Sequence, residues 1–173
     1  MAPPPLLEER AAQPYLGIAA RVTGEAEFRS AVDRGFPELF GWLRENDVEP
    51  SGPPFIRYLE LDGEGEPLEI ELAVPTAAAR AGNGQIRADA LPAGRYATFL
   101  HVGPYRSADV PDLASARAEL LDWAERQGIE LERATSKRGT RFRACVERYI
   151  TDPSRESDWS KWKTELAYLT TSS

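Results

Sequence analysis

An internal repeat restricts the fold of this chain more than any other feature of its sequence. Each half shows the same order of patterns: a strand-like run, an amphipathic helical run and two further strand-like runs. A constant shift along the chain aligns Tyr15 with Tyr96 and Trp42 with Trp123, so similar residues recur at corresponding places. We therefore predict an α+β fold that contains a duplicated β-α-β-β unit.

The repeat also sets the expected limits of the domain. We predict a single domain over residues 14–170, with the first unit at about 14–76 and the second at about 84–170. Residues 1–13 are rich in proline and then polar, so we expect them to form a flexible leader. Because proline disrupts helix interiors, the firm helix of the first unit is expected to begin near Pro37.

Composition excludes several classes of function. The net charge of −7 and the pI near 4.9 argue against direct binding to nucleic acid, which needs clustered Lys and Arg. No apolar run approaches the roughly 20 residues of a membrane span. The N-terminus carries acidic residues where a secretory signal is basic, so we predict a cytoplasmic protein. With one cysteine and one histidine, and no Gly-rich phosphate loop, no metal site or cofactor is expected.

One carboxylate lies within the most strand-like part of the second half. At a strand's period of two, Glu147 shares a face with Cys145 and Tyr149. Burying an ionised carboxylate costs several kcal/mol or more unless a partner compensates it. A salt bridge to an arginine or an exposed edge strand would explain Glu147, and so would a site in which the partner is a ligand.

Aromatic residues follow Glu147 closely in the chain. Trp159, Trp162 and Tyr168 all lie within the next turn-rich and strand-like segments, together with Glu165. Aromatic faces attract cations, by about 0.5–1 kcal/mol when exposed and about 2 kcal/mol or more when desolvated. This combination of rings and negative charge suits a flat, apolar, cationic guest.

Four motifs, in order, resemble a known family. They are GRYATFLHVGPY at 94–105, LLDWAERQG at 120–128, VERYITDP at 146–153 and WKTELAYL at 162–169. The chain resembles the GyrI-like small-molecule-binding family, which is related to the BmrR-type, multidrug-responsive effector-binding domain. The resemblance implies two β-α-β-β (SHS2-like) modules in a pseudo-twofold arrangement. It also implies an antiparallel sheet with both helices on one face and a ligand pocket on the other.

The resemblance assigns roles to the motif residues. Glu147 matches the family's pocket glutamate, which faces lipophilic cations, and Tyr149 lies beside it. In the first unit, Tyr58 is the counterpart of Tyr149 and Ile56 is the counterpart of Glu147. Cys145 is expected to be an unreactive small residue beside the pocket.

Three further aromatic residues have two possible roles each. Trp159 and Trp162 are three positions apart and would share one side of a helical turn, as core or lid packing, as ligand contacts at the pocket mouth, or as both. Tyr105 would either line the pocket rim or pack against its neighbours.

A second acid raises the question of catalysis. Glu165 points away from the face shared by Leu166 and Tyr168, so it faces the pocket if Leu166 packs under the helices. Two carboxylates on one concave face can divide acid and base roles because like charge raises one pKa. A solvent-exposed acid on an edge strand is the alternative. Some GyrI-like proteins are hydrolases that open cyclopropane rings of DNA-alkylating natural products, with pocket glutamates implicated.

Three functions remain open from the sequence. The first is a stand-alone binder of hydrophobic, often cationic or planar, small molecules. The second is a hydrolase of reactive, cyclopropane-containing natural products that uses Glu147 and Glu165 as catalytic residues. The third is a protein-interaction module of the gyrase-inhibitor type, which would need a protein partner.

Overall fold

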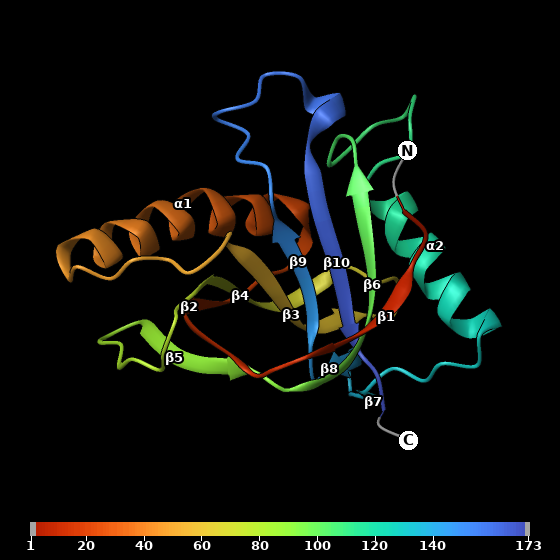
Figure 1. The fold of residues 1–173 in the computed structure, drawn as a ribbon, viewed down its shortest axis with the longest axis horizontal. Coiled ribbons are helices and arrows are strands. Elements are labelled where there is room, and N and C mark those ends of the chain that lie inside the picture. The colour runs from red at the N-terminus through yellow and green to blue at the C-terminus, as the bar shows by residue number, and fades with distance from the viewer. Residues whose placement is uncertain (1–2, 172–173) are drawn as a thin grey trace.

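The computed structural model describes residues 3–171 and has two helices and one ten-stranded sheet (Figure 1). All pairings between its strands are antiparallel, as the family resemblance implied. The elements in chain order are β1 Leu6–Arg10, β2 Gln13–Arg21, α1 Gly24–Glu45, β3 Phe55–Asp62, β4 Pro67–Pro75, β5 Ile86–Leu91, β6 Gly94–Val102, α2 Leu113–Arg126, β7 Arg133–Thr135, β8 Gly139–Phe142, β9 Cys145–Tyr149, the 3-10 helix η1 Trp159–Lys161 and β10 Lys163–Leu169.

The predicted duplication is visible in the strand order. The middle of the sheet runs β6-β10-β9-β3-β4-β2. One half belongs to the unit β6-α2-β9-β10 and the other to the unit β2-α1-β3-β4, and corresponding strands lie at equal distances from the junction between β9 and β3. The two units meet where β3 pairs with β9, and Ile56 lies opposite Glu147 in that pairing. This junction is the pseudo-twofold centre of the fold, and β1, β5 and the β7–β8 hairpin are additions to it.

Both helices cover the same face of the sheet, as expected. Leu39 and Leu43 of α1 pack with Leu16 and Val74 of the strands below. In the second unit, apolar residues of α2 pack in the same way against β6 and β10, in a cluster that includes Leu120. Within residues 3–171, neither helix is long and apolar enough to cross a membrane.

Helix α1 begins earlier than the sequence suggested. It starts at Gly24, and Pro37 lies inside it. Pro37 is on the exposed side of the helix, where water can satisfy the carbonyl group that the proline leaves unbonded. Gly35 is buried against Leu72 of β4, and a side chain at this position would overlap the Leu72 methyl group. The glycine therefore allows a close approach of helix and sheet rather than ending the helix.

The N-terminal segment also differs from expectation. Residues 6–10, expected in a flexible leader, form β1 and pair with the edge of β6 from Thr98 to Gly94. The side chains of β1 are largely exposed, so its backbone hydrogen bonds rather than an apolar pattern hold it in place. This is why the pattern of the sequence did not reveal it. Residues 1–2 lie outside the described part of the chain.

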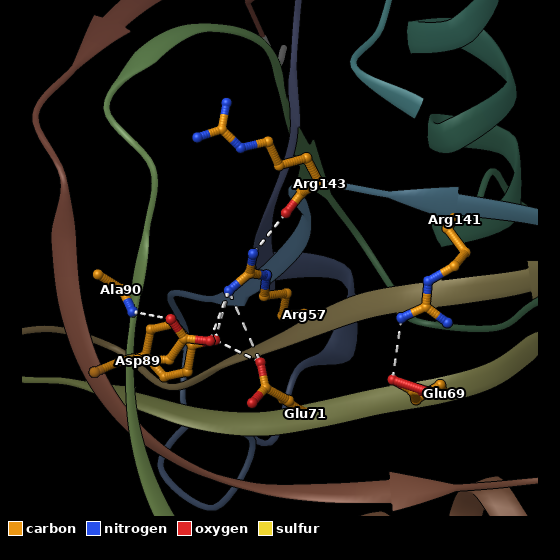
Figure 2. A network of polar contacts seen from close by, with 8 residues as sticks. Arg57, Glu69, Glu71, Asp89, Ala90, Arg141 and Arg143 are labelled. Atoms are coloured by element: carbon orange, nitrogen blue, oxygen red, sulfur yellow. Dashed lines mark hydrogen bonds and ion pairs between the residues drawn. The ribbon is translucent and has the colours of Figure 1, made fainter. Parts of the chain in front are cut away.

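The face opposite the helices encloses a second core. Tyr15, Tyr96 and Leu169 come from β2, β6 and β10, yet pack in one cluster, because the sheet curls until its two ends approach each other. At the centre of this face, Arg57 donates hydrogen bonds to the Tyr15 hydroxyl at 2.7 Å and to the Arg143 carbonyl at 2.6 Å. Figure 2 shows Arg57 reaching the carbonyl group of Arg143 and lying near Glu71. This face is thus filled by the protein's own side chains.

Candidate functional site

A cavity of about 660 Å³ lies between the two helices. Strands β3 and β9 form its floor, because α1 packs on β2 and β4 while α2 packs on β6, leaving the central strands uncovered. Figure 1 shows the helices lying apart on either side of these strands. The cavity is therefore on the helix-covered face. The expectation that the pocket would open on the opposite face is wrong, since the sheet curls and its own side chains fill that face.

Glu147 lies on the cavity floor at the junction of the two units. The residue is 5% exposed, and the pairing of β9 places it between Ile56 of β3 and Leu166 of β10. The hydroxyl groups of Tyr58 and Tyr149 both donate hydrogen bonds to Glu147 Oε1, at 3.1 and 2.5 Å. Tyr58 and Tyr149, which the sequence analysis associated with Glu147, are thus both in direct contact with its carboxylate.

Arg117 of α2 is the partner of Glu147 that sequence reasoning missed. Its guanidinium group donates a hydrogen bond to Glu147 Oε2 at 2.7 Å and lies 5.8 Å from the centre of the Tyr58 ring. A signal was present: Arg117 is four residues after Leu113 and four before Leu121, so it lies along the apolar stripe of its helix. An arginine in such a stripe needs a partner, and Glu147 provides it.

Aromatic side chains form the walls around the Arg117–Glu147 pair. Phe28 of α1 stacks on Tyr58 with ring centres 6.3 Å apart. Tyr149 receives two edge contacts, from Phe36 of α1 at 6.4 Å and from Tyr105 at 5.7 Å. The cavity therefore presents aromatic faces on several sides of one buried carboxylate, an arrangement that favours flat apolar groups.

Electrostatics keep the polar groups of the floor in defined protonation states. Burial, reinforced by the charge of Glu147, raises the pKa of Tyr58 and of Tyr149 well above the ordinary value, so both hydroxyls remain donors. Burial lowers the pKa of Arg117, but the Glu147 carboxylate and the neighbouring Tyr168, Tyr58 and Cys145 together outweigh this, and the net shift of the pKa is upward. Burial and Glu147 also raise the pKa of Tyr105 to about 12.

Other residues singled out in the sequence lie at the same cavity. Ile56 and Cys145 line the floor, and both are almost completely buried. Burial raises the pKa of the Cys145 thiol to about 12, so it is held as an unreactive thiol at neutral pH. Tyr105 lines the wall. At the mouth, Glu25 forms ion pairs with Arg29 and Arg106, all three with largely exposed side chains.

The two tryptophans take different places. Trp162 packs against Tyr105 with ring centres 4.8 Å apart, and its indole nitrogen donates a hydrogen bond to the Glu156 carbonyl at 2.9 Å. It supports the wall from behind. Trp159 is half exposed and lines a second hollow of about 620 Å³, which lies between α2 and the end of β6. Trp159 is not among the residues lining the Glu147 cavity.

Glu165 lies on the opposite face of the sheet. In β10 it alternates with Leu166, which packs in the core under the helices, so its side chain points away from Glu147. Glu165 accepts a hydrogen bond from Arg10 at 2.9 Å and lies 3.8 Å from Arg148. Leu166 does pack under the helices, but the cavity is on that same face. The expectation that Glu165 faces the pocket is therefore corrected.

Comparisons with known proteins agree with the fold. The family model described as GyrI-like small molecule binding domain matches residues 3–167. No curated protein matches the sequence significantly. Among solved structures, the EcmrR C-terminal domain is similar with a TM-score of 0.76 and 18% identity, and 98% of each chain is covered.

Two further solved structures share the fold. EcmrR in complex with DNA has a TM-score of 0.76 and 20% identity, and the match covers 98% of this chain but 57% of that one. SAV2435 bound to tetraphenylphosphonium has a TM-score of 0.57 and 14% identity, with 96% of this chain and 93% of that chain covered. At such identities these likenesses establish the fold alone.

Proposed function

The chain belongs to the GyrI-like small molecule binding family, and on this premise we propose that it binds bulky or planar hydrophobic molecules, lipophilic cations among them, in the cavity between α1 and α2. The observation that carries the proposal is the buried Glu147 carboxylate at the base of an aromatic cavity. The volume of about 660 Å³ falls within the range of roughly 300–1,000 Å³ that is usual for small-molecule sites.

Apolar contact supplies most of the affinity in this proposal. Burial of apolar surface contributes about 25 cal/mol per Å², and the cavity walls are largely aromatic and aliphatic. Glu147 contributes selectivity, because a cation near it is attracted by the carboxylate and by the faces of Tyr58 and Phe28. The same fold in SAV2435 holds tetraphenylphosphonium, which supports a lipophilic cation as one class of ligand.

The cellular role remains a proposal as well. The net charge of −7 supports binding of ligands rather than of nucleic acid. We propose that the domain acts by itself in the cytoplasm and sequesters its ligand. A protein partner of the gyrase-inhibitor kind stays a prediction.

A pair of isosteric ions tests the proposal. Tetraphenylphosphonium and tetraphenylborate have nearly the same shape and opposite charge, so the ratio of their dissociation constants isolates the effect of charge. Quenching of tryptophan fluorescence reports binding, because Trp162 packs on Tyr105 in the cavity wall. We expect saturable quenching by the cation, weakened at least about threefold in Glu147→Gln, with tetraphenylborate binding unchanged or tighter.

Glu165→Gln is the matched control, since it removes the same charge from the opposite face of the sheet. It should leave the affinity for tetraphenylphosphonium unchanged. Absence of saturable binding, or equal effects of the two substitutions, would refute the proposed site.

Of the two acids that the hydrolase alternative would use, only Glu147 lies at the cavity. Glu147 and the hydroxyls of Tyr58 and Tyr149 are in contact, whereas Glu165 is on the other face. Turnover of a cyclopropane-containing alkylating agent tests it. An enzyme of this kind would lose activity in Glu147→Gln and keep it in Glu165→Gln.

A further inference from the structure

Arg117 makes the contacts by which an aromatic cavity recognises a cation. Its guanidinium group lies 2.7 Å from a carboxylate oxygen of Glu147 and 5.8 Å from the centre of the Tyr58 ring. A carboxylate together with an aromatic face is the environment that the proposed function assigns to a bound lipophilic cation. Arg117 and such a ligand would therefore use the same two groups.

The contacts of Arg117 allow it to leave. Within residues 3–171, the guanidinium group donates a single hydrogen bond to another side chain, the one to Glu147, and the side chain is 29% exposed. Arg57, on the opposite face, has a side chain that is only 10% exposed and is bonded to two partners. Arg117 is thus held by one hydrogen bond and by the face of the Tyr58 ring, and its long flexible stem can carry the charge out to water.

We infer that Arg117 is a resident cation of the cavity, and that a lipophilic cation binds by displacing it from Glu147. This inference rests on the proposed function and adds to it a rule of selection. A tethered competitor acts at an effective concentration in the millimolar range, so it weakens the apparent affinity of any cation that needs Glu147. A ligand must offer both a charge and enough apolar surface to replace the arginine. A small hydrated cation does not meet this condition.

Displacement predicts a specific coupling between two substitutions. In the wild type, a bound cation is attracted by the Glu147 carboxylate, but its binding breaks the ion pair between Arg117 and Glu147. The two contributions to the binding free energy therefore partly cancel. In Arg117→Met no pair is broken, and the full attraction of Glu147 is available to the ligand. The penalty of Glu147→Gln on tetraphenylphosphonium binding should therefore be at least about tenfold larger in the Arg117→Met background.

The experiment measures both tetraphenyl ions with the wild type, the two single variants and the double variant. We expect Arg117→Met to bind tetraphenylphosphonium at least about tenfold more tightly than the wild type. Arg126→Met is the control for a simple loss of positive charge, because Arg126 lies on the same helix, pairs with Asp122 and does not line the cavity. It should change the affinity less than about threefold.

A second readout uses the wild-type protein and does not depend on the folding of any variant. Phenylglyoxal modifies exposed guanidinium groups, and mass spectrometry locates the modified arginine. Saturating tetraphenylphosphonium should accelerate modification of Arg117, whereas tetraphenylborate should not.

The outcomes separate the two levels of the argument. If tetraphenylphosphonium binds neither the wild type nor Arg117→Met, the proposed function fails and the inference with it. If the cation binds the wild type, but the Glu147→Gln penalty is equal in both backgrounds or Arg117 becomes less reactive on binding, the inference alone is overturned.

Discussion

Replacement of Arg57 by methionine tests how the face opposite the cavity stabilises the fold. Arg57 is 8% exposed and donates a hydrogen bond to the Tyr15 hydroxyl. It also donates one to the Arg143 carbonyl (Figure 2). The Tyr15 hydroxyl in turn donates to Glu71, which is 6% exposed and lies 3.9 Å from Arg57. Methionine keeps much of the apolar stem but removes the charge, so a buried carboxylate and a hydroxyl lose their cationic partner.

The size of the effect follows from these contacts. Two unit charges 3.9 Å apart attract by about 4 kcal/mol at an effective dielectric constant of about 20, before the cost of desolvating Arg57 is subtracted. Removing one member of a buried ion pair destabilises proteins by about 3–5 kcal/mol, because the other member stays buried. A domain of this length loses about 2–4 °C of melting temperature per kcal/mol. We therefore expect Arg57→Met to lower the melting temperature by about 6–20 °C.

Differential scanning calorimetry measures this shift, and Arg95→Met is the matched control. Arg95 forms an ion pair of 2.9 Å with Glu9, but the side chains are 52% and 69% exposed. Exposed pairs contribute about 0–1 kcal/mol, so the control should melt within about 4 °C of the wild type. Equal melting temperatures for the two variants would refute the reasoning that burial makes the Arg57 network important.

Two further predictions concern pH and backbone packing. Burial raises the pKa of the Cys145 thiol from 9.0 to about 12, so the folded state holds this proton more tightly than the unfolded state and stability is lost as pH rises through that range. The free energy of unfolding in urea should fall by about 1 kcal/mol between pH 8 and pH 10, and by less in Cys145→Ala. Gly139→Ala should destabilise the fold by about 1–3 kcal/mol in the same assay, because a methyl group there would overlap the Leu61 carbonyl of β3. Gly63→Ala is its control, since nothing lies within 4 Å of the added methyl group, and an equal loss in both variants would contradict this account.

The local patterns of the sequence were sufficient for much of the fold. Alternation of residues placed Cys145, Glu147 and Tyr149 on one face of a strand, and the structure has them there. The repeat predicted the order of strands and helix within each unit. Patterns failed where backbone geometry or hydrogen bonding, and not side-chain polarity, decides the structure. Pro37 inside α1 and the exposed strand β1 are the two clearest cases.

By itself, the sequence determined that Cys145, Glu147 and Tyr149 share one face of a strand, because side-chain periodicity is a property of each strand alone. The repeat matched Tyr58 with Tyr149. Only the tertiary structure decided which face carries the cavity, since this depends on how far apart the helices pack and on how strongly the sheet curls. It also decided that Arg117, thirty positions before Glu147, is the partner of that carboxylate and that Glu165 is not its neighbour. Contacts between separate elements are set by packing, and no local pattern encodes them.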